Sequence, residues 1–225
     1  MSTIRISGLL LILTAIATAV SVMTRLNSSM EPLAGSPIQL PIILDTVQYV
    51  IAGAARVLSG LALPAAAVYL WMALRVSQPQ AMGLAAILLA LSGAITAISG
   101  ACMLALAAGI PQAADGSATL MAWGAPGWLE PMDAVRWIAG KVGFTLAGLG
   151  LIALGPVQWR IGGLLKISAV ADVIIGVAML FIWVDAATVM HRVSGIAFLF
   201  WLIISGVWLT LGLLKSPQPA TSEPT

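Results

Sequence analysis

Six long runs of apolar residues, separated by shorter polar stretches, make up most of the sequence. They cover residues 6–23, 47–74, 81–109, 135–156, 164–184 and 193–214. A helix that crosses a hydrocarbon core of about 30 Å needs roughly 20 mostly apolar residues, because each residue adds about 1.5 Å and lipid offers no partner to an unpaired backbone group. The pattern therefore predicts an all-α fold, a polytopic transmembrane helical bundle of six spans.

The polar stretches between the runs predict how the helices follow one another. Residues 75–80, 157–163 and 185–192 are short connections, so we expect the helices on either side of each to pack antiparallel. Residues 24–46 and 110–134 are longer connections that contain several prolines. With six spans, both longer connections fall on the same side of the bundle.

The spans leave little sequence for any other domain, so we predict a single membrane domain over residues 1–215. Residues 216–225, rich in Pro, Ser and Thr, are predicted to form a disordered tail. The first run also has features of a signal peptide, because Arg5 precedes an apolar run that contains small residues. We prefer a retained helix, because the run continues through Met23, beyond the usual apolar region of about 7–15 residues. Cleavage would leave five spans.

The composition supports a membrane protein and excludes several other classes. Hydrophobic residues make up 60% of the 225 residues and charged residues 8%, and the mean hydropathy is +1.06. A soluble domain has about a quarter of its residues charged, so a soluble enzyme, a disordered chain and a coiled coil are excluded. One cysteine excludes a disulfide scaffold. The net charge of +2 comes without a basic cluster, so we expect the partner to be the lipid bilayer and not a nucleic acid.

The positive charges near the ends of the spans predict the orientation, since cytoplasmic loops retain Lys and Arg. One side of the bundle carries five of them: Arg5, Arg75, Arg160, Lys166 and Lys215. The other side carries three: Arg25, Arg136 and Arg192. We therefore predict that both termini are cytoplasmic.

Small residues at helical spacing predict where the spans touch, because they let helix backbones approach closely in lipid. In the third run, Gly93, Ala97, Ala101 and Ala105 recur every four residues. Trp201 lies near the middle of the last run, away from the headgroup level that tryptophan prefers. We expect Trp201 to pack against another helix.

Three ionisable residues lie within the spans, where charge is costly and usually faces the interior of a bundle. Asp172 lies about 12 Å from the inner end of its span, close to the midplane, while Arg56 and Lys141 lie near the outer boundary. A tight ion pair between Asp172 and Lys141 is not expected, because their heights differ by about 10 Å. We predict a protonated Asp172 that hydrogen bonds to Ser168 or to a backbone carbonyl.

The outer charges predict a candidate binding site. Arg56 and Lys141 are near enough to the outer loops to meet their acids, which include Asp133 and Asp185. We predict an outward-facing polar vestibule lined by Arg56, Lys141, Asp133 and Asp185, with Asp172 below it. In the alternative interpretation, Arg56 and Lys141 extend their charges to the headgroups and Asp172 bonds locally.

The sequence predicts no cofactor, no metal site and no catalytic residue. His191 is the only histidine, which excludes paired-histidine haem ligation and a histidine-rich metal site. We interpret it as an exposed interfacial residue, with a mixed metal site including Asp185 or a methionine as the alternative. Ser194 lies three residues after His191, but no second helix supplies a base for an intramembrane serine hydrolase. Nucleotide-binding and metalloprotease motifs do not occur, so an enzyme is the third choice.

The starts of the first and last runs carry a similar pattern. The first begins Arg5-Ile6-Ser7-Gly8-Leu9-Leu10 and the last Arg192-Val193-Ser194-Gly195-Ile196-Ala197-Phe198-Leu199-Phe200-Trp201. Together with six spans, a long outer first loop and Arg56-Val57-Leu58 in the second run, this resembles the bacterial integral membrane family known as domain of unknown function 4386. The resemblance covers most of the chain. It implies a six-helix, multi-pass protein of the cell membrane, the bacterial inner membrane, and it transfers no catalytic residue.

Two functional classes stay open. We favour a structural or accessory membrane component that holds a membrane-protein partner, a second copy or lipids. The alternative is small-solute binding or transport through the outward-facing polar cavity, with Asp172 changing its protonation. Transporters usually have broken helices or clear inverted repeats, and the sequence has no convincing example of either.

Overall fold

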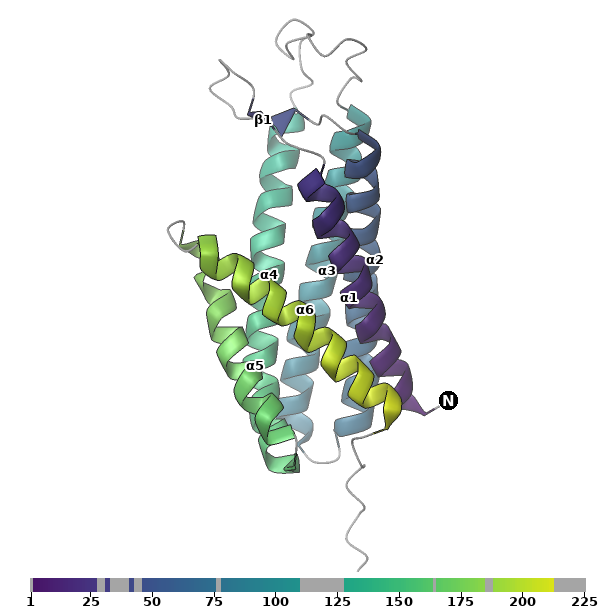
Figure 1. Ribbon diagram of the computed structural model, residues 1–225, viewed down its shortest axis with the longest axis vertical. Coiled ribbons are helices and arrows are strands. Elements are labelled where there is room, and N and C mark those ends of the chain that lie inside the picture. Colours follow the sequence, from purple (N-terminus) through teal and green to yellow (C-terminus); the bar gives the residue numbers. More distant parts are fainter. Residues whose placement is uncertain are drawn as a thin grey trace, which may run out of the picture.

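The computed structural model describes residues 2–27, 31–32, 41–42, 46–75, 78–109, 128–163, 165–184 and 188–212. Within these residues the fold is a bundle of long helices (Figure 1). The elements in chain order are α1 (Thr3–Asn27), β1 (Glu31–Pro32), β2 (Pro41–Ile42), α2 (Thr46–Leu74), α3 (Pro79–Gly109), α4 (Leu129–Ile161), α5 (Leu165–Leu180), the 3₁₀ turn η2 (Phe181–Trp183) and α6 (Thr188–Leu211). The two short strands pair antiparallel, with Glu31 opposite Ile42.

Six helical segments in the described part of the chain are long and apolar enough to cross a membrane. Helices α2, α3 and α4 contain 29, 31 and 33 residues, so each is about 44–50 Å long. They are longer than a hydrocarbon core of about 30 Å is thick. Helix α5 contains 16 residues and reaches spanning length together with η2. The prediction of an all-α bundle with six apolar helices is confirmed.

Helix α4 differs most from its predicted range. The hydropathy pattern predicted residues 135–156, whereas the helix runs from Leu129 to Ile161 and includes Pro156. It ends where Gly162 and Gly163 take positive φ angles of 87° and 61°, a conformation that residues with a Cβ rarely adopt. The Gly162 N–H donates to the Gln158 carbonyl at 3.2 Å. Two glycines, and not the proline, therefore terminate α4.

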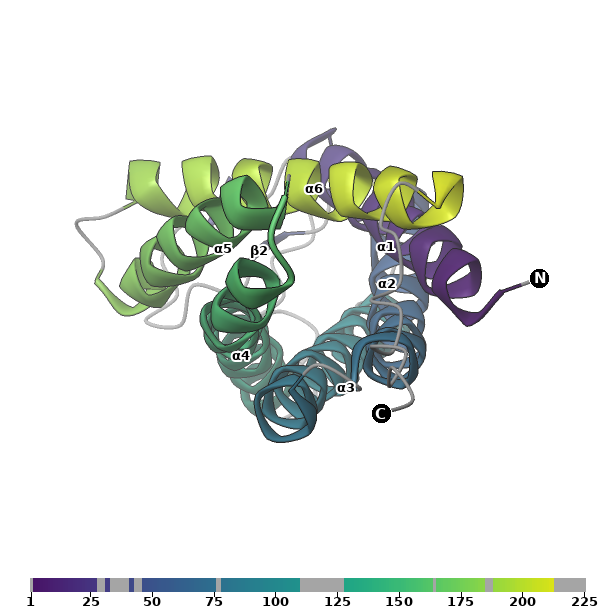
Figure 2. The ribbon, with the colours of Figure 1, turned by 90° about the horizontal axis from the view of Figure 1, so that it is seen from below.

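Consecutive helices pack against each other, and α6 returns to contact α1 (Figures 1 and 2). Helix α6 crosses the bundle at a slant, so it covers both α5 and α1 (Figure 1). Gly8 of α1 faces Gly206 of α6, which places the start of α1 beside the end of α6. The other end of the bundle is closed by a cluster that joins α2, α3 and α4 and contains Tyr49, Met103 and Met132.

Three pairs of helices touch through their backbones. A Cβ added at a glycine of each pair would lie 2.4–2.5 Å from a backbone atom of the partner helix, closer than real Cβ atoms approach. The contacts are Gly60 of α2 with Ala97 of α3, Gly176 of α5 with Gly148 of α4, and Gly8 of α1 with Gly206 of α6. Close approach through small residues is the usual way in which helices associate in lipid.

The predicted small-residue face of α3 is confirmed at Gly93 and Ala97, which contact α2, but Ala101 is exposed. A spacing of four residues advances about 40° beyond a full turn at each step, so the face turns away from α2. Gly100, seven residues after Gly93, returns to the contact and lies against Val57.

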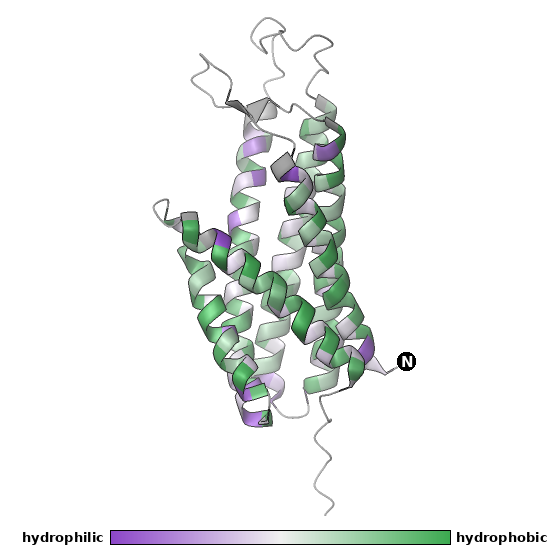
Figure 3. Cartoon of the chain, in the orientation of Figure 1, coloured by the Kyte–Doolittle hydropathy of each residue, from purple (hydrophilic) through white to green (hydrophobic). Residues whose placement is uncertain are grey.

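Apolar side chains cover the outside of the bundle as well as its core. Ile16, Leu61 and Ile174 are 57%, 61% and 64% exposed, and they come from three different helices. Figure 3 shows hydrophobic residues along the middle of the bundle and hydrophilic residues mainly toward its ends. Soluble monomers rarely expose an apolar surface of this extent. Together with the six apolar helices, this surface indicates a multi-pass membrane protein.

Candidate functional site

The structure places the residues of the predicted vestibule in three different surroundings. Arg56 and Asp133 belong to a group at the end of the bundle where α2 and α4 begin. Lys141 lies between two tryptophans, and Asp172 lies in a buried pocket among α4, α5 and α6. Asp185 lies outside the described residues. The structure thus brings Arg56 and Asp133 together and places Lys141 and Asp172 elsewhere.

Arg56 and Asp133 are part of an arginine cluster, which comprises Arg25 of α1, Tyr49 and Arg56 of α2, and Asp133 and Arg136 of α4. Tyr49 is buried, and all four charged residues are close enough to act on it electrostatically. Three guanidinium groups from three helices therefore share one region with a single described carboxylate.

The position of each cluster residue is set by neighbouring helices. Asp133 accepts a 2.7 Å hydrogen bond from Arg136 Nε, one turn along α4. Ser99 of α3 donates to the Arg136 carbonyl at 2.9 Å. The Arg56 guanidinium lies against Gly140 of α4, where an added Cβ would be 2.9 Å from Arg56 Nη2. Arg56 Nε is buried without a hydrogen-bond partner in the described part of the chain.

Lys141 lies on a different side of α4, among aromatic rings. Its Nζ is 5.0 Å from the centroid of the Trp137 ring and 5.4 Å from that of Trp183, distances at which a cation is attracted to the ring face. Trp183 Nε1 donates to Thr145 Oγ1 at 2.8 Å, which holds η2 against α4. Both tryptophans are exposed, as expected for residues at headgroup level. The Lys141 charge therefore lies beside exposed aromatic rings, and its extension to the headgroups stays a prediction.

Asp172 belongs to a second polar group, the Asp172 pocket, which comprises Asp172 and Ser168 of α5, Gln158 of α4 and Trp201 of α6. Asp172 is 0% exposed, Gln158 6% and Trp201 5%. As predicted, Ser168 Oγ donates to Asp172 Oδ1, at 3.4 Å. Gln158 and Trp201 lie close to the same carboxyl group. All three neighbours are neutral, so the pocket itself contains no cation for Asp172.

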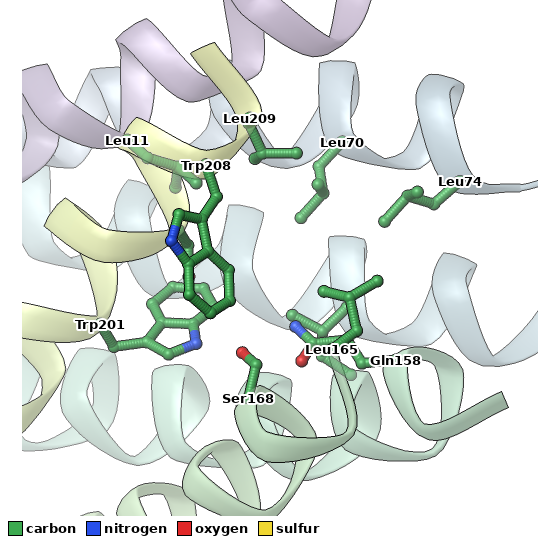
Figure 4. Close-up of a pocket in the computed structure, with 11 residues that line it drawn as sticks. Leu11, Leu70, Leu74, Gln158, Leu165, Ser168, Trp201, Trp208 and Leu209 are labelled. Carbon is green, nitrogen blue, oxygen red and sulfur yellow. The ribbon is translucent and has the colours of Figure 1, made fainter. Parts of the chain in front are cut away.

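A small cavity adjoins this pocket. It has about 20 Å³ of space for the centre of a water molecule and is bounded on its apolar side by leucines that include Leu11 and Leu70. Figure 4 shows the Ser168 hydroxyl, the Gln158 amide and the Trp201 ring nitrogen pointing toward one another at its polar side. A single water molecule needs about 10–15 Å³ of such space, so the cavity has room for a water and not for a larger solute.

Three buried atoms of the Asp172 pocket have no hydrogen-bond partner among the described residues. They are Asp172 Oδ2, which donates when the carboxyl group holds its proton, the acceptor Gln158 Oε1 and the donor Trp201 Nε1. A water molecule can donate two hydrogen bonds and accept two, so one water can satisfy all three atoms. The pocket therefore has the chemistry of a buried water site next to a carboxyl group.

The arginine cluster and the Asp172 pocket lie far apart along the bundle. Leu70, which lines the cavity, is 14 residues after Arg56 on α2, a rise of about 21 Å. Gln158 is 22 residues after Arg136 on α4, a rise of about 33 Å. Asp172 lies near the opposite end because it is only two turns into α5, which begins at that end.

In the described part of the chain, no three His, Cys, Asp or Glu side chains gather in a way that could hold a metal ion. His191 and Ser194 both lie on α6, and Ser194 is buried there.

Several residues of the two groups were not among the predicted site residues. Arg25 and Arg136 were used only to predict the orientation of the bundle. The i, i+3 spacing of Asp133 and Arg136 could nevertheless have predicted an ion pair between them. Gln158 follows Pro156 and fell in a predicted connection, but it lies in α4. Trp201 was expected to pack against another helix and does so.

No family model, no curated protein and no solved structure matches this chain. The resemblance to the family of domain of unknown function 4386 therefore stays a prediction.

Proposed function

We propose that this chain is a structural or accessory component of the bacterial inner membrane, which holds a membrane-protein partner or a second copy and carries out no turnover. The observation that supports this proposal is the separation of the ionisable residues. Arg56, Lys141 and Asp172 lie in three surroundings, and the cavity next to Asp172 has room for one water molecule. A path for a polar solute needs its charged groups along a common polar space.

The close contacts between helices also favour this role. Backbones touch at α2–α3, α4–α5 and α1–α6, so these pairs cannot move apart without losing their packing. Hydroxyl groups add hydrogen bonds between helices: Ser7 donates to the Ala66 carbonyl at 3.0 Å and Ser92 to the Gly143 carbonyl at 2.7 Å. A bundle locked in this way is better suited to presenting a fixed outer surface than to alternating access.

We infer that both termini are cytoplasmic. The end of the bundle that contains the start of α1 also carries Arg75, Arg160 and Lys166, and cytoplasmic ends retain positive charge. The side chains of Arg75 and Lys166 lie over Trp71 and Trp159, at ring-centroid distances of 5.1 Å and 5.6 Å. Cations next to tryptophan are typical of headgroup level.

Cysteine labelling tests the orientation, because Cys102 is the only cysteine in the sequence and is buried. In a Cys102→Ser background, Ser2→Cys should react with a membrane-impermeant maleimide only after spheroplasts are lysed. Ala134→Cys, at the opposite end, should react in intact spheroplasts. The reverse pattern of labelling would overturn the orientation.

The accessory role is tested against transport in two steps. A photo-cross-linking residue placed at exposed Ile174 or Leu61 in native membranes should give a discrete adduct, with a second copy or with one other membrane protein, from one face only. Vesicles reconstituted with the purified chain should take up solutes no faster than empty vesicles. Uptake that Asp172→Asn and Asp172→Leu abolish, while the helical content stays intact, would instead support small-solute transport with Asp172 titrating.

A further inference from the structure

A groove runs along the outside of the bundle where α4 passes into α5. It is lined by Trp159 of α4 and by five residues of α5, which are Lys166, Ile167, Val170, Ala171 and Ile174. The α5 residues recur at helical spacing, so they form a stripe along one side of that helix. The groove has about 540 Å³ of space, within the range of about 300–1,000 Å³ that is typical of binding sites for small organic molecules.

The groove has a cationic end and an apolar floor. Lys166 lies one residue after the start of α5, and Ile174 lies eight residues further along, a rise of about 12 Å. The floor between them includes Ile167 and Val170, and all three of these apolar side chains are exposed. From the end of the bundle toward its middle, the groove therefore changes from cationic to apolar. A phospholipid in a bilayer changes in the same direction, from its phosphate to its acyl chains.

The Lys166 ammonium is held at the cationic end of the groove. Its Nζ lies 5.6 Å from the centroid of the Trp159 ring, a distance at which a cation is attracted to the ring face. The turn at Gly162 and Gly163 brings the two residues together, and the Lys166 N–H donates to the Gly163 carbonyl at 3.2 Å. A cation that is already positioned loses less conformational freedom when a ligand binds.

We propose that this groove binds one anionic phospholipid, with its phosphate next to Lys166 and an acyl chain along Ile167, Val170 and Ile174. Basic sites between helices at the ends of membrane spans hold anionic headgroups. The exposed floor provides apolar contacts for the acyl chain. Lys166 supplies the selectivity, because the headgroup of phosphatidylcholine carries a cation of its own, which the ammonium repels.

The proposal is independent of the accessory role, which concerns protein partners. It assigns the face around Ile174 to lipid. The protein adduct that tests the accessory role should then come from Leu61 and not from Ile174.

The experiment measures which lipid lies in the groove. A photo-cross-linking residue is placed at Ile174 of the full chain, in nanodiscs that contain equal amounts of phosphatidylcholine and phosphatidylglycerol, and mass spectrometry identifies the lipid adducts. Ile87 is the control position, because it is 59% exposed against 64% for Ile174 and lies at a similar distance from the start of its helix, α3. We expect phosphatidylglycerol to be enriched about fivefold at Ile174 relative to Ile87, equivalent to about 1 kcal/mol for one lysine.

Lys166→Gln is the decisive variant, and Arg75→Gln is its matched control. Both remove one exposed positive charge that lies over a tryptophan ring at the same end of the bundle, since Arg75 is 5.1 Å from the centroid of Trp71. Lys166→Gln should abolish the enrichment at Ile174, whereas Arg75→Gln should leave it unchanged. Lys166→Arg keeps the charge and should retain the enrichment.

A second pair of variants tests the apolar floor. Ala171→Phe fills the groove and should lower the enrichment at Ile174, because the acyl chain loses its place. Val177→Phe adds a phenylalanine at an exposed position of the same helix outside the groove and should have no effect. Circular dichroism checks that the helical content of each variant is intact.

Three outcomes overturn the proposal. Equal enrichment at Ile174 and Ile87 in the wild type would mean that anionic lipid gathers around the whole end of the bundle. Enrichment that survives Lys166→Gln would mean that another group attracts the headgroup. A protein adduct from Ile174 in native membranes would mean that a protein covers the groove.

Discussion

Ser168 and Asp172 lie one turn apart on α5, and the Ser168 hydroxyl donates a 3.4 Å hydrogen bond to Asp172 Oδ1. The second carboxyl oxygen, Oδ2, is buried and has no protein partner among the described residues. This pair anchors the Asp172 pocket, where Gln158 and Trp201 supply the other polar groups. All the neighbours are neutral, so we expect Asp172 to hold its proton inside the bundle.

Replacing Asp172 tests that expectation. Asp172→Asn keeps the shape of the side chain, an oxygen that accepts from Ser168 and a hydrogen-bond donor in place of the carboxyl O–H. It should therefore change the free energy of unfolding by less than about 1 kcal/mol. Asp172→Leu leaves buried polar groups unpaired and should cost about 1–3 kcal/mol for each of them. Unfolding in mixed micelles, followed by circular dichroism, measures both. If Asp172→Asn lowers the free energy of unfolding as much as Asp172→Leu does, Asp172 is ionised in the folded chain.

A bridging water in the Asp172 pocket leads to a second prediction, which concerns the stability of a Trp201→Phe variant. Without a water, Trp201 Nε1 is an unsatisfied donor, and Trp201→Phe should not lower stability through hydrogen bonding. With a water that bridges Trp201, Asp172 and Gln158, the same change should remove one hydrogen bond and cost about 1 kcal/mol more than a control. Trp159→Phe is the control, because Trp159 is exposed.

The measurement compares the free energy of unfolding of Trp201→Phe and Trp159→Phe in two backgrounds, the wild-type chain and a chain that carries Gln158→Leu. The extra cost of Trp201→Phe should shrink when Gln158→Leu removes another partner of the same water, since coupled groups are not additive. Additive effects of the two substitutions would argue against a shared water. Trp201 also stacks on Phe198, at a centroid distance of 5.8 Å, and phenylalanine retains an aromatic ring for this contact.

The ion pair between Asp133 and Arg136 carries a third prediction. Asp133→Asn removes the one described carboxylate from the arginine cluster and leaves three like charges together. We expect a loss of about 2 kcal/mol in the free energy of unfolding, the usual range for a hydrogen bond to a charged group. Arg136→Gln in the same chain should restore part of the loss, because it lowers the repulsion. A double variant less stable than Asp133→Asn alone would contradict this electrostatic explanation.

The sequence predicted the six spans well because the length of an apolar run is a direct consequence of membrane thickness. It also predicted the Ser168–Asp172 hydrogen bond, which depends only on residues four apart on one helix. The burial of Trp201 followed from its unusual depth, since a polar N–H in mid-span has to face another helix.

The contacts between distant segments could not be predicted in the same way. Gln158 meets Asp172 only because α4 continues past Pro156 until Gly162, so a single proline was a misleading end signal. Arg25 joins Arg56 because α1 and α2 pack side by side, and local spacing gives no information on that. For the same reason, the sequence placed Arg56 and Asp172 in one cavity although the bundle holds them far apart.

The backbone contact between α4 and α5 makes a fourth prediction, for which the chain offers a matched control. A Cβ at Gly176 would lie 2.5 Å from the Gly148 carbonyl oxygen and 3.3 Å from the Ile152 nitrogen, so Gly176→Ala must push the two helices apart. Overpacking of this kind costs about 1–3 kcal/mol. At Gly83, an added Cβ would meet only Trp71 Nε1, at 3.8 Å, which is an ordinary contact.

Gly83→Ala should therefore leave stability unchanged or raise it by up to about 1 kcal/mol, because alanine loses less backbone freedom in a helix than glycine. The two variants differ only in position, so their unfolding curves in mixed micelles isolate the effect of the helix contact. Because α5 is short and depends on α4 for much of its packing, Gly176→Ala should also increase hydrogen exchange across α5. A Gly176→Ala chain as stable as Gly83→Ala would show that α4 and α5 do not touch through their backbones.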